Sequence, residues 1–175
     1  IADLLKKEFQ PSIKYYLDVT TTSTDPEVFR LYLEGMKFWN KREFAQACQM
    51  YFKALEIDPD FIPGMVYLIF AYGQQGYFQE AKQWSLVLYQ KKDEVSRLEK
   101  VMIQAVYSRF MGNPSETIKY YRMLLDMDDH LSEAYHEIGI NFLRLHQYEN
   151  AIPEFEKNLE ILKKWGVGAS YAYHY

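Results

Sequence analysis

Residues 47–54, with the sequence ACQMYFKA, decide the fold of this chain. They place a small residue first, an aromatic residue four positions later and another small residue three positions after that. The small and aromatic positions return along the chain at Ala81, at Thr117-Tyr121 and at Ala151-Phe155. A repeat of about 34 residues, with helical spacing inside it, predicts stacked pairs of helices.

Helix-start and turn signals fit the same interval. Thr24-Asp25-Pro26-Glu27 has the form of a capping box, and Ser96-Arg97-Leu98-Glu99 is a second one. Each would begin the first helix of a pair. The turn inside a pair is predicted at Trp39-Asn40-Lys41-Arg42 and, one or more repeats later, at Gly76, Gly112 and His146.

With these residues, the chain resembles the tetratricopeptide-repeat family over about residues 25–175. The resemblance implies an all-α fold, a right-handed superhelical solenoid of antiparallel helix pairs. The array itself would occupy residues 23–175. Its repeats would span about 28–61, 62–95, 98–131 and 132–165, with a partial fifth repeat or a capping helix over 166–175.

Residues 1–22 do not follow the repeat. A short apolar stripe, interrupted by Pro11, leads into a polar β-branched run, and together they predict an N-terminal helix and linker. The segment is either a cap on the array or the tail of an upstream domain, and we favour the tail. The chain begins with Ile1, so we expect it to be a piece of a longer protein, and the absence of a signal peptide carries no information.

Two features of the repeats lead to packing predictions. Gly35 is expected to be small because the neighbouring helix passes close to it. The second repeat has Ser85 where an aromatic residue is usual and Leu88 where a small residue is usual. We expect Trp84 to supply the missing aromatic volume. The two extra residues before the third repeat should lengthen a helix end or a loop.

Composition limits the possible partners. The net charge is −4 at pH 7, and Lys and Arg are scattered among more numerous acidic residues, which argues against general nucleic-acid binding. No run of eighteen apolar residues is present, so no membrane span is expected. The single cysteine, Cys48, is predicted to be a buried thiol, and it favours a reducing, cytoplasmic compartment.

Arrays of this family bind partners along the concave face that their first helices line. Residues one step off the core stripe of those helices should point into that groove. Most of them are apolar or aromatic, the types that supply interface energy. The predicted partner-binding groove consists of Phe29, Tyr32, Met36, Trp39, Val66, Phe70, Met102, Val106, Arg109, Phe110, His136, Ile140 and Arg144.

Some members of the family bind acidic peptide ends through a clamp of cationic and amide side chains. At the corresponding positions this chain has no cation, which excludes that clamp. The residues there are Tyr32, Met36, Tyr67, Glu99 and Ile103.

No catalytic constellation and no cofactor site is apparent. The four histidines lie too far apart in the sequence to share one helical turn, and the acidic clusters at 58–60 and 126–129 are expected to be turns or solvated faces, without a metal.

The sequence therefore predicts a protein–protein interaction scaffold that binds a peptide or a helix in a largely apolar groove, and no enzyme. One alternative is the regulatory or recognition region of a larger bacterial signalling or transcription-regulating protein. Another is a self-association module that forms a homo-oligomer through its terminal repeats.

Overall fold

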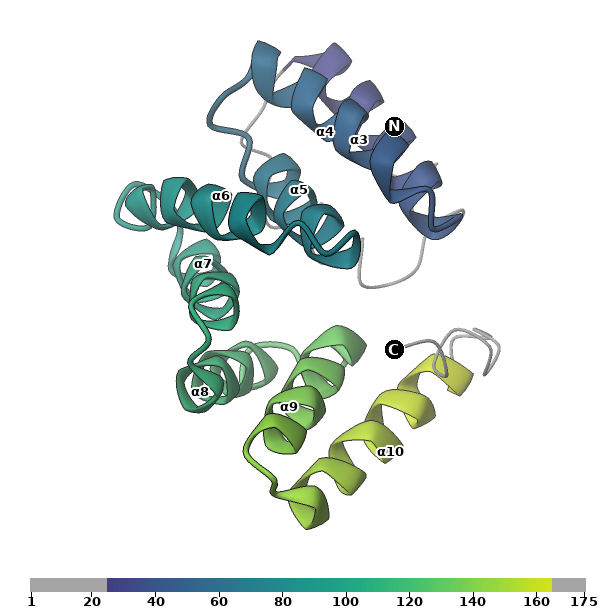
Figure 1. Cartoon of the computed structure of the whole chain (residues 1–175), viewed down its shortest axis with the longest axis vertical. Coiled ribbons are helices and arrows are strands. Elements are labelled where there is room, and N and C mark those ends of the chain that lie inside the picture. The colour runs from purple at the N-terminus through teal and green to yellow at the C-terminus, as the bar shows by residue number, and fades with distance from the viewer. Residues whose placement is uncertain (1–24, 165–175) are drawn as a thin grey trace. The chain divides into compact units, whose positions relative to one another are not determined.

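The computed structural model describes residues 25–164, and all regular structure in that range is helical (Figure 1). This confirms the predicted all-α class. The predicted N-terminal segment 1–22 and the partial fifth repeat 166–175 lie outside the described residues. The helices are α3 (Pro26–Asn40), α4 (Phe44–Ile57), α5 (Ile62–Gln74), α6 (Phe78–Gln90), α7 (Arg97–Phe110), α8 (Pro114–Leu125), α9 (Ser132–Arg144) and α10 (Tyr148–Lys164).

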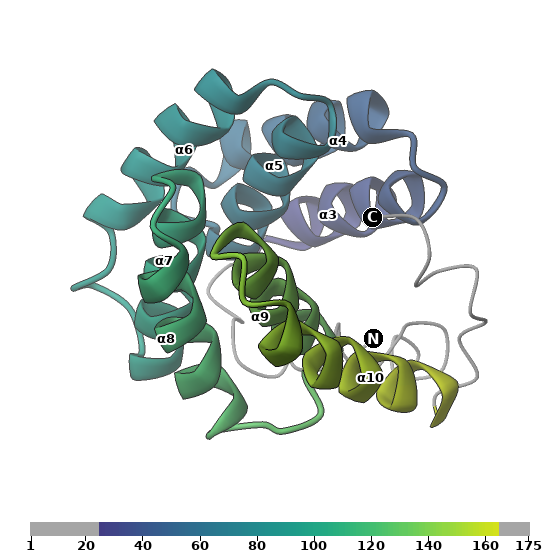
Figure 2. The same cartoon turned by 60° about the horizontal axis from the view of Figure 1, so that its bottom comes forward.

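The described helices belong to two compact units. The N-terminal unit contains α3 to α7, and the C-terminal unit contains α8 to α10. Within each unit, every helix packs against the next one along the chain, as Figure 2 shows for α3 to α7. The division falls between Met111 and Gly112, in the turn that joins the two helices of the predicted third repeat.

The predicted capping box at Ser96 and Glu99 is confirmed, and α3 is capped by a residue of the other predicted box. At α7 both halves of the box form, because Ser96 Oγ accepts from the Glu99 amide at 3.3 Å and the Glu99 carboxylate accepts from the Ser96 amide at 2.9 Å. At α3 the capping residue is instead Asp25, whose carboxylate accepts from the Glu27 amide at 2.8 Å. The side chain of Glu27 pairs with Arg30, and Thr24 of the predicted box lies outside the described residues.

The turn inside each helix pair has a left-handed residue at the same repeat position. These residues are Arg42, Gly76, Gly112 and His146, with φ values of 62°, 80°, 73° and 57°. Each follows the previous one by one repeat, so the predicted turns are confirmed. Glycine adopts this conformation without strain, while an arginine or a histidine does so at a cost.

Two glycines bring paired helices into close contact. A Cβ atom on Gly35 would lie 2.4 Å from Cε1 of Tyr51, so only glycine leaves room for that ring. A Cβ on Gly139 would lie 2.7 Å from Phe155 in the same way. The prediction for Gly35 is therefore confirmed, and an aromatic ring from the second helix occupies the space.

The second repeat reverses this size pattern. Ile69 stands one repeat after Gly35, and Ser85 stands one repeat after Tyr51; both are fully buried. The large residue is therefore on the first helix and the small one on the second. Trp84 does not take the aromatic position, because its ring lies against Phe52 of α4, with 6.1 Å between the ring centroids. That prediction was wrong, since Ile69 already has the bulk at the equivalent place.

The extra residues before the third repeat lie in a loop. The connection 91–96 between α6 and α7 is two residues longer than the connection 58–61 between α4 and α5. The helices on either side keep their repeat positions.

Candidate functional site

Five of the predicted groove residues are in the interior of the N-terminal unit. Each is at most 5% exposed, so none lines an open surface. A projection along one helix places them one step off the core, but they are buried in the packed interior of the unit. The five are Tyr32, Met36, Val66, Met102 and Val106.

Tyr32 illustrates why the projection failed. Its ring meets Phe61 at 5.4 Å and Tyr67 at 5.8 Å between centroids, and it lies 6.0 Å from Tyr51. The side chain is fully buried, and its hydroxyl has no hydrogen-bond partner. Burial raises the pKa of the Tyr32 hydroxyl well above its usual value. Tyr32 therefore belongs to the core that joins α3, α4 and α5.

The other predicted groove residues of this unit are half-buried: Phe29, Trp39, Phe70, Arg109 and Phe110. Phe29 packs edge-on against Phe61. Trp39 reaches from α3 to α5, where its ring meets Tyr67 at 5.5 Å between centroids. The groove prediction omitted Tyr67, although it is half-buried and lies between Trp39 and the core.

A second aromatic contact forms between α5 and α7. The rings of Phe70 and Phe110 lie 5.9 Å apart between centroids. Phe110 also lies over Gly73, where a Cβ atom would be 3.0 Å from the ring. The guanidinium of Arg109 covers both rings, at 5.0 Å from the centroid of Phe70 and 5.5 Å from that of Phe110. These are cation–π distances.

The two aromatic contacts meet on one face of α5, because the α5 residues in them, Tyr67 and Phe70, are three positions apart. We call this set the aromatic strip: Trp39, Tyr67, Phe70, Arg109 and Phe110. None of the thirteen residues of α5 is charged. The strip therefore offers aromatic surface on an uncharged helix, with one cation at its α7 edge.

The C-terminal unit presents the remaining predicted residues on α9. His136, Ile140 and Arg144 follow at intervals of four, which places them on one side of the helix. His136 and Ile140 are half-buried, and Arg144 is exposed. The His136 ring meets Phe155 edge-on at 5.8 Å, and Arg144 donates to the side chain of Asn141 at 3.4 Å.

The positions that correspond to the family's clamp for acidic peptide ends do not form such a clamp in this chain. Tyr32, Met36 and Ile103 are buried hydrophobic residues, and Glu99 is 3% exposed. One carboxylate oxygen of Glu99 serves the capping box of α7, and the other is buried without a hydrogen-bond partner. None of these side chains can hold a carboxylate ligand.

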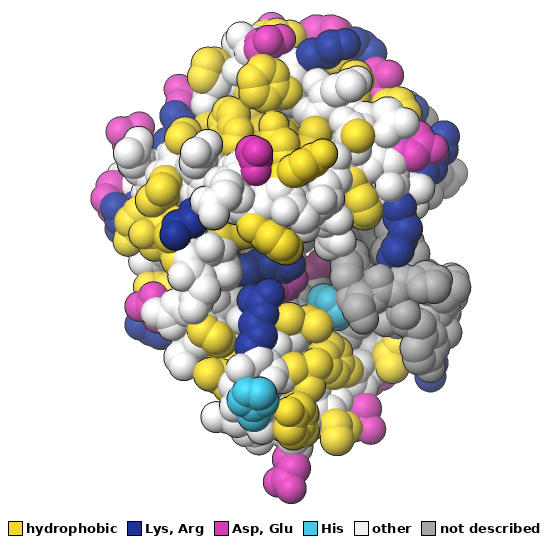
Figure 3. Space-filling view, viewed as in Figure 1, with side chains coloured by type: hydrophobic (Ala, Val, Ile, Leu, Met, Phe, Trp, Pro, Cys, Tyr) yellow, Lys and Arg dark blue, Asp and Glu magenta, His cyan; other side chains and the backbone are white. Residues whose placement is uncertain are grey.

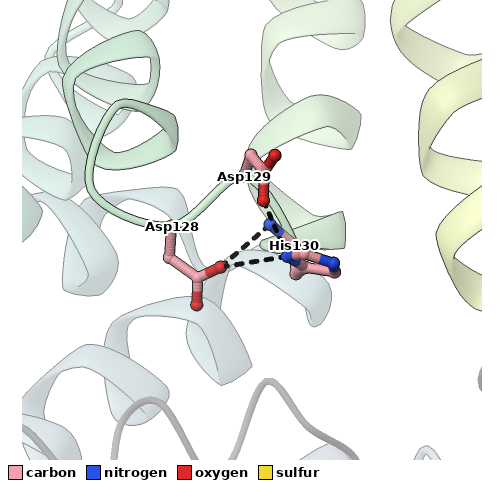
Figure 4. A group of neighbouring side chains, drawn as sticks. All are labelled: Asp128, Asp129 and His130. Carbon is pink, nitrogen blue, oxygen red and sulfur yellow. Dashed lines mark hydrogen bonds and ion pairs between the residues drawn. The ribbon is translucent and has the colours of Figure 1, made fainter.

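Asp128, Asp129 and His130 form the one group of potential metal ligands among the described residues (Figure 4). His130 Nδ1 lies 2.7 Å from Asp129 Oδ1, and the His130 amide donates to Asp128 Oδ1 at 2.9 Å. The amide of Asp60 donates to Asp58 in the same way, at 3.0 Å, in the loop before α5. Asp128, Asp129 and His130 therefore lie in a turn of the loop between α8 and α9, as expected for the acidic clusters.

Cys48 is buried in α4, as predicted, and accepts a hydrogen bond from Gln75 at 3.3 Å. Burial raises the pKa of its thiol to about 11, so the thiol is neutral near pH 7. A neutral thiol is a poor nucleophile. Among the described helices, none is both long enough and apolar enough to cross a membrane.

Comparisons with known proteins bear on the fold. No protein-family model matches the sequence, and no curated protein matches it either. The chain is similar to the structure of TTC0263, a thermophilic TPR protein of Thermus thermophilus, with a TM-score of 0.58 and 12% identity over 83% of this chain and 86% of that one. It is also similar to MamA, residues 41 to the end, from Desulfovibrio magneticus RS-1, with a TM-score of 0.50 and 13% identity over 93% and 92%. At these identities the likeness is one of fold.

Proposed function

From the premise that this chain folds as a tetratricopeptide-repeat array, we propose that it is a protein–protein interaction scaffold. Its partner is a peptide or a helix, and the contact is made on the aromatic strip without catalysis. The observation that supports this most directly is the placement of half-buried aromatic rings around an uncharged helix.

The side chains of the strip are of the types that anchor protein interfaces. Aromatic residues and arginine supply most of the binding energy in such contacts, because they bury a large area at a small cost in side-chain entropy. The mutual contacts of Trp39 with Tyr67 and of Phe70 with Phe110 fix the ring orientations before a partner arrives. Preorganisation of this kind improves affinity.

The residues available for chemistry support binding and not turnover. The one thiol is buried and neutral. The guanidinium of Arg109 is stacked on the rings of Phe70 and Phe110. An arginine in this setting can hold a partner, but it does not transfer protons near neutral pH.

The test uses a displayed library of random peptides selected on the wild-type chain. Selected peptides are then titrated against Phe70→Glu, which places a carboxylate in the strip. The matched control is Phe78→Glu, the same change at a 65% exposed residue at the start of α6. Circular dichroism checks that both variants stay helical.

We expect at least a tenfold loss of affinity for Phe70→Glu, which corresponds to about 1.4 kcal/mol, and no change for Phe78→Glu. Arg109→Ala, at the edge of the strip, should give a smaller loss with full helicity. Equal binding by Phe70→Glu, Arg109→Ala and wild type would refute the assignment of the strip.

A further inference from the structure

Two tyrosines stack on each other where α6 meets α7. The rings of Tyr89 and Tyr107 lie 4.0 Å apart between centroids, with 23° between their planes. Aromatic pairs usually have their centroids about 4.5–7 Å apart, so this stack is unusually close. The other close tyrosine pairs among residues 25–164 are tilted or edge-on, with centroids 5.8 Å or more apart. Only in the α6–α7 pair, within that range, do two phenol rings meet face to face.

The two other repeat junctions described by the structure do not use this pair. Their equivalent residues are buried, at most 9% exposed, whereas Tyr89 and Tyr107 are both half-buried. Packing of one repeat on the next therefore does not require the tyrosines. The equivalents are Leu55 and Ala71 between α4 and α5, and Leu125 and Asn141 between α8 and α9.

Neighbouring residues hold the two rings in place and leave them within reach of solvent. Lys92 Nζ lies 4.4 Å from the centroid of the Tyr89 ring, which is a cation–π distance. Asp93, in the loop between α6 and α7, pairs with Lys92 at 3.2 Å and with Lys100 of α7 at 2.6 Å. Figure 3 shows hydrophobic and basic side chains on the surface over α6, at the left of the view.

We infer that Tyr89 and Tyr107 form a modification site, at which a one-electron oxidant joins the two rings as dityrosine. The oxidant is of the class of high-valent metal centres, which take single electrons from phenols. Because the rings are already in contact, the coupling of two radicals takes place within one molecule and needs no encounter between chains. Neither tyrosine belongs to the aromatic strip, so the inference does not depend on the proposed function.

The reaction balances as a two-electron oxidation. Each phenol gives up one electron and its hydroxyl proton, and the two tyrosyl radicals form a carbon–carbon bond between their Cε atoms. The hydrogen on each of these carbons then passes to the oxygen of the same ring, which restores both phenols. The two electrons go to the oxidant and the two hydroxyl protons go to solvent. The product is a covalent bridge between α6 and α7, and such a bridge restricts the unfolded chain as a disulfide does.

Peptide mapping after photo-oxidation tests this inference. The chain is illuminated at low concentration with a ruthenium(II) tris-bipyridyl complex and persulfate, which generate a ruthenium(III) oxidant, and the monomer is isolated and digested with trypsin. Cleavage after lysine and arginine puts Tyr89 alone in the peptide 83–91 and Tyr107 alone in the peptide 101–109. Mass spectrometry then detects the two peptides joined, with the loss of two hydrogens.

The variants Tyr89→Phe and Tyr107→Phe keep a ring for stacking but lack the phenol. The matched control is Tyr148→Phe, the same change at a 57% exposed residue of α10. Circular dichroism checks that all three variants stay helical. A further control oxidises the wild type in denaturing urea, where the stack is lost but the sequence separation is the same.

We expect the link between 83–91 and 101–109 in the folded wild-type monomer, at about tenfold the yield of any other tyrosine link within one chain. Tyr148→Phe should keep this link, both stack variants should lose it, and urea should reduce it to the level of the other pairs. The inference is overturned if the link is absent from the folded wild type. It is also overturned if the link occurs only between chains, or if it forms equally in urea.

Discussion

The N-terminal and C-terminal units stack their second helices through equivalent residues, with opposite chemistry. Between α4 and α6 the contact is two aromatic rings, Phe52 and Trp84. Between α8 and α10, two repeats later in the sequence, it is the ion pair of Arg122 with Glu154. The same helix arrangement thus accepts either an apolar or an ionic contact at this point.

The interiors of the two units differ in the same way, with an apolar residue in the N-terminal unit where the C-terminal unit has a polar one. Leu88 is fully buried in the N-terminal unit, while its equivalent Asn158 donates from its side chain to the carbonyl of Ser132 at 2.6 Å. Among residues 25–164, six of the nine buried polar or charged residues lie in the C-terminal unit. They are Thr117, Ser132, Glu137, Asn141, Glu154 and Asn158.

The repeat fixes the size of some residues and leaves the polarity of others free. Small and large residues must alternate where helices approach, as at Gly35 with Tyr51 and at Gly139 with Phe155. Polarity at the next positions is not fixed, provided that buried donors and acceptors are paired. The N-terminal unit uses that freedom for aromatic surface, and the C-terminal unit uses it for buried hydrogen bonds.

The largest effect should come from truncating the aromatic rings at the glycine contacts. Tyr51→Ala should destabilise the N-terminal unit by about 3–5 kcal/mol, because the ring is fully buried. Phe155→Ala should cost about half as much, since that ring is only half-buried. Denaturant unfolding followed by circular dichroism measures both losses.

Alkylation of Cys48 reports the N-terminal unit separately. The chain has no other cysteine, and we expect this thiol to react mainly when α4 opens, because it is buried in the folded state and burial raises its pKa to about 11. Early labelling in Tyr51→Ala, with wild-type labelling in Phe155→Ala, is the expected result. Equal destabilisation by the two changes would contradict the ranking.

The next largest effect should come from breaking the ion pair between Arg122 and Glu154. Arg122→Ala leaves Glu154, 7% exposed, without its counter-charge. We expect a loss of about 2 kcal/mol, below the range for a fully buried pair because the Arg122 side chain is 45% exposed. The double change Arg122→Phe with Glu154→Trp copies the N-terminal contact and should recover most of that loss.

Thermal unfolding measures these variants, with Arg30→Ala as the control. Arg30 also pairs with two carboxylates, at 2.7 and 2.8 Å, but those pairs are exposed and should matter little. A double variant less stable than Arg122→Ala would show that the two chemistries are not interchangeable at this position.

The smallest effect is expected at the left-handed turns, where the units do not differ. Arg42→Gly in the N-terminal unit and His146→Gly in the C-terminal unit should each stabilise by up to about 1 kcal/mol, because glycine has no steric penalty at positive φ. Gly76→Ala should destabilise by a similar amount. Melting temperatures that fall for both glycine variants would contradict this interpretation of the turns.

Local signals predicted the elements that depend on spacing. The repeat interval located the turns at Arg42, Gly76, Gly112 and His146, and the small residue at Gly35 predicted the close helix contact. The box at Ser96 and Glu99 also formed as expected. These features depend on steric fit and on hydrogen bonds within a few residues, both of which a single sequence encodes.

The candidate site was less predictable, because it depends on side chains that cross between helices. Projection along one helix could not show that Tyr67 and Phe61 cover Tyr32, or that Phe110 reaches Gly73 on α5. The expectation that Trp84 supplies the missing aromatic volume was also wrong, because Ile69 fills the equivalent space from the other helix. At each of these positions the neighbouring repeat decides the exposure.

The uncharged helix α5 has a consequence for how the chain is made. On a ribosome that adds about 5–20 residues per second, Phe110 follows Gln74 by about two to seven seconds. During that time α5 has no partner on its α7 side, and its apolar surface is available to chaperones or to other nascent chains. A shortened gene that stops between α5 and α7 should therefore yield insoluble protein, whereas one that extends past Phe110 should not.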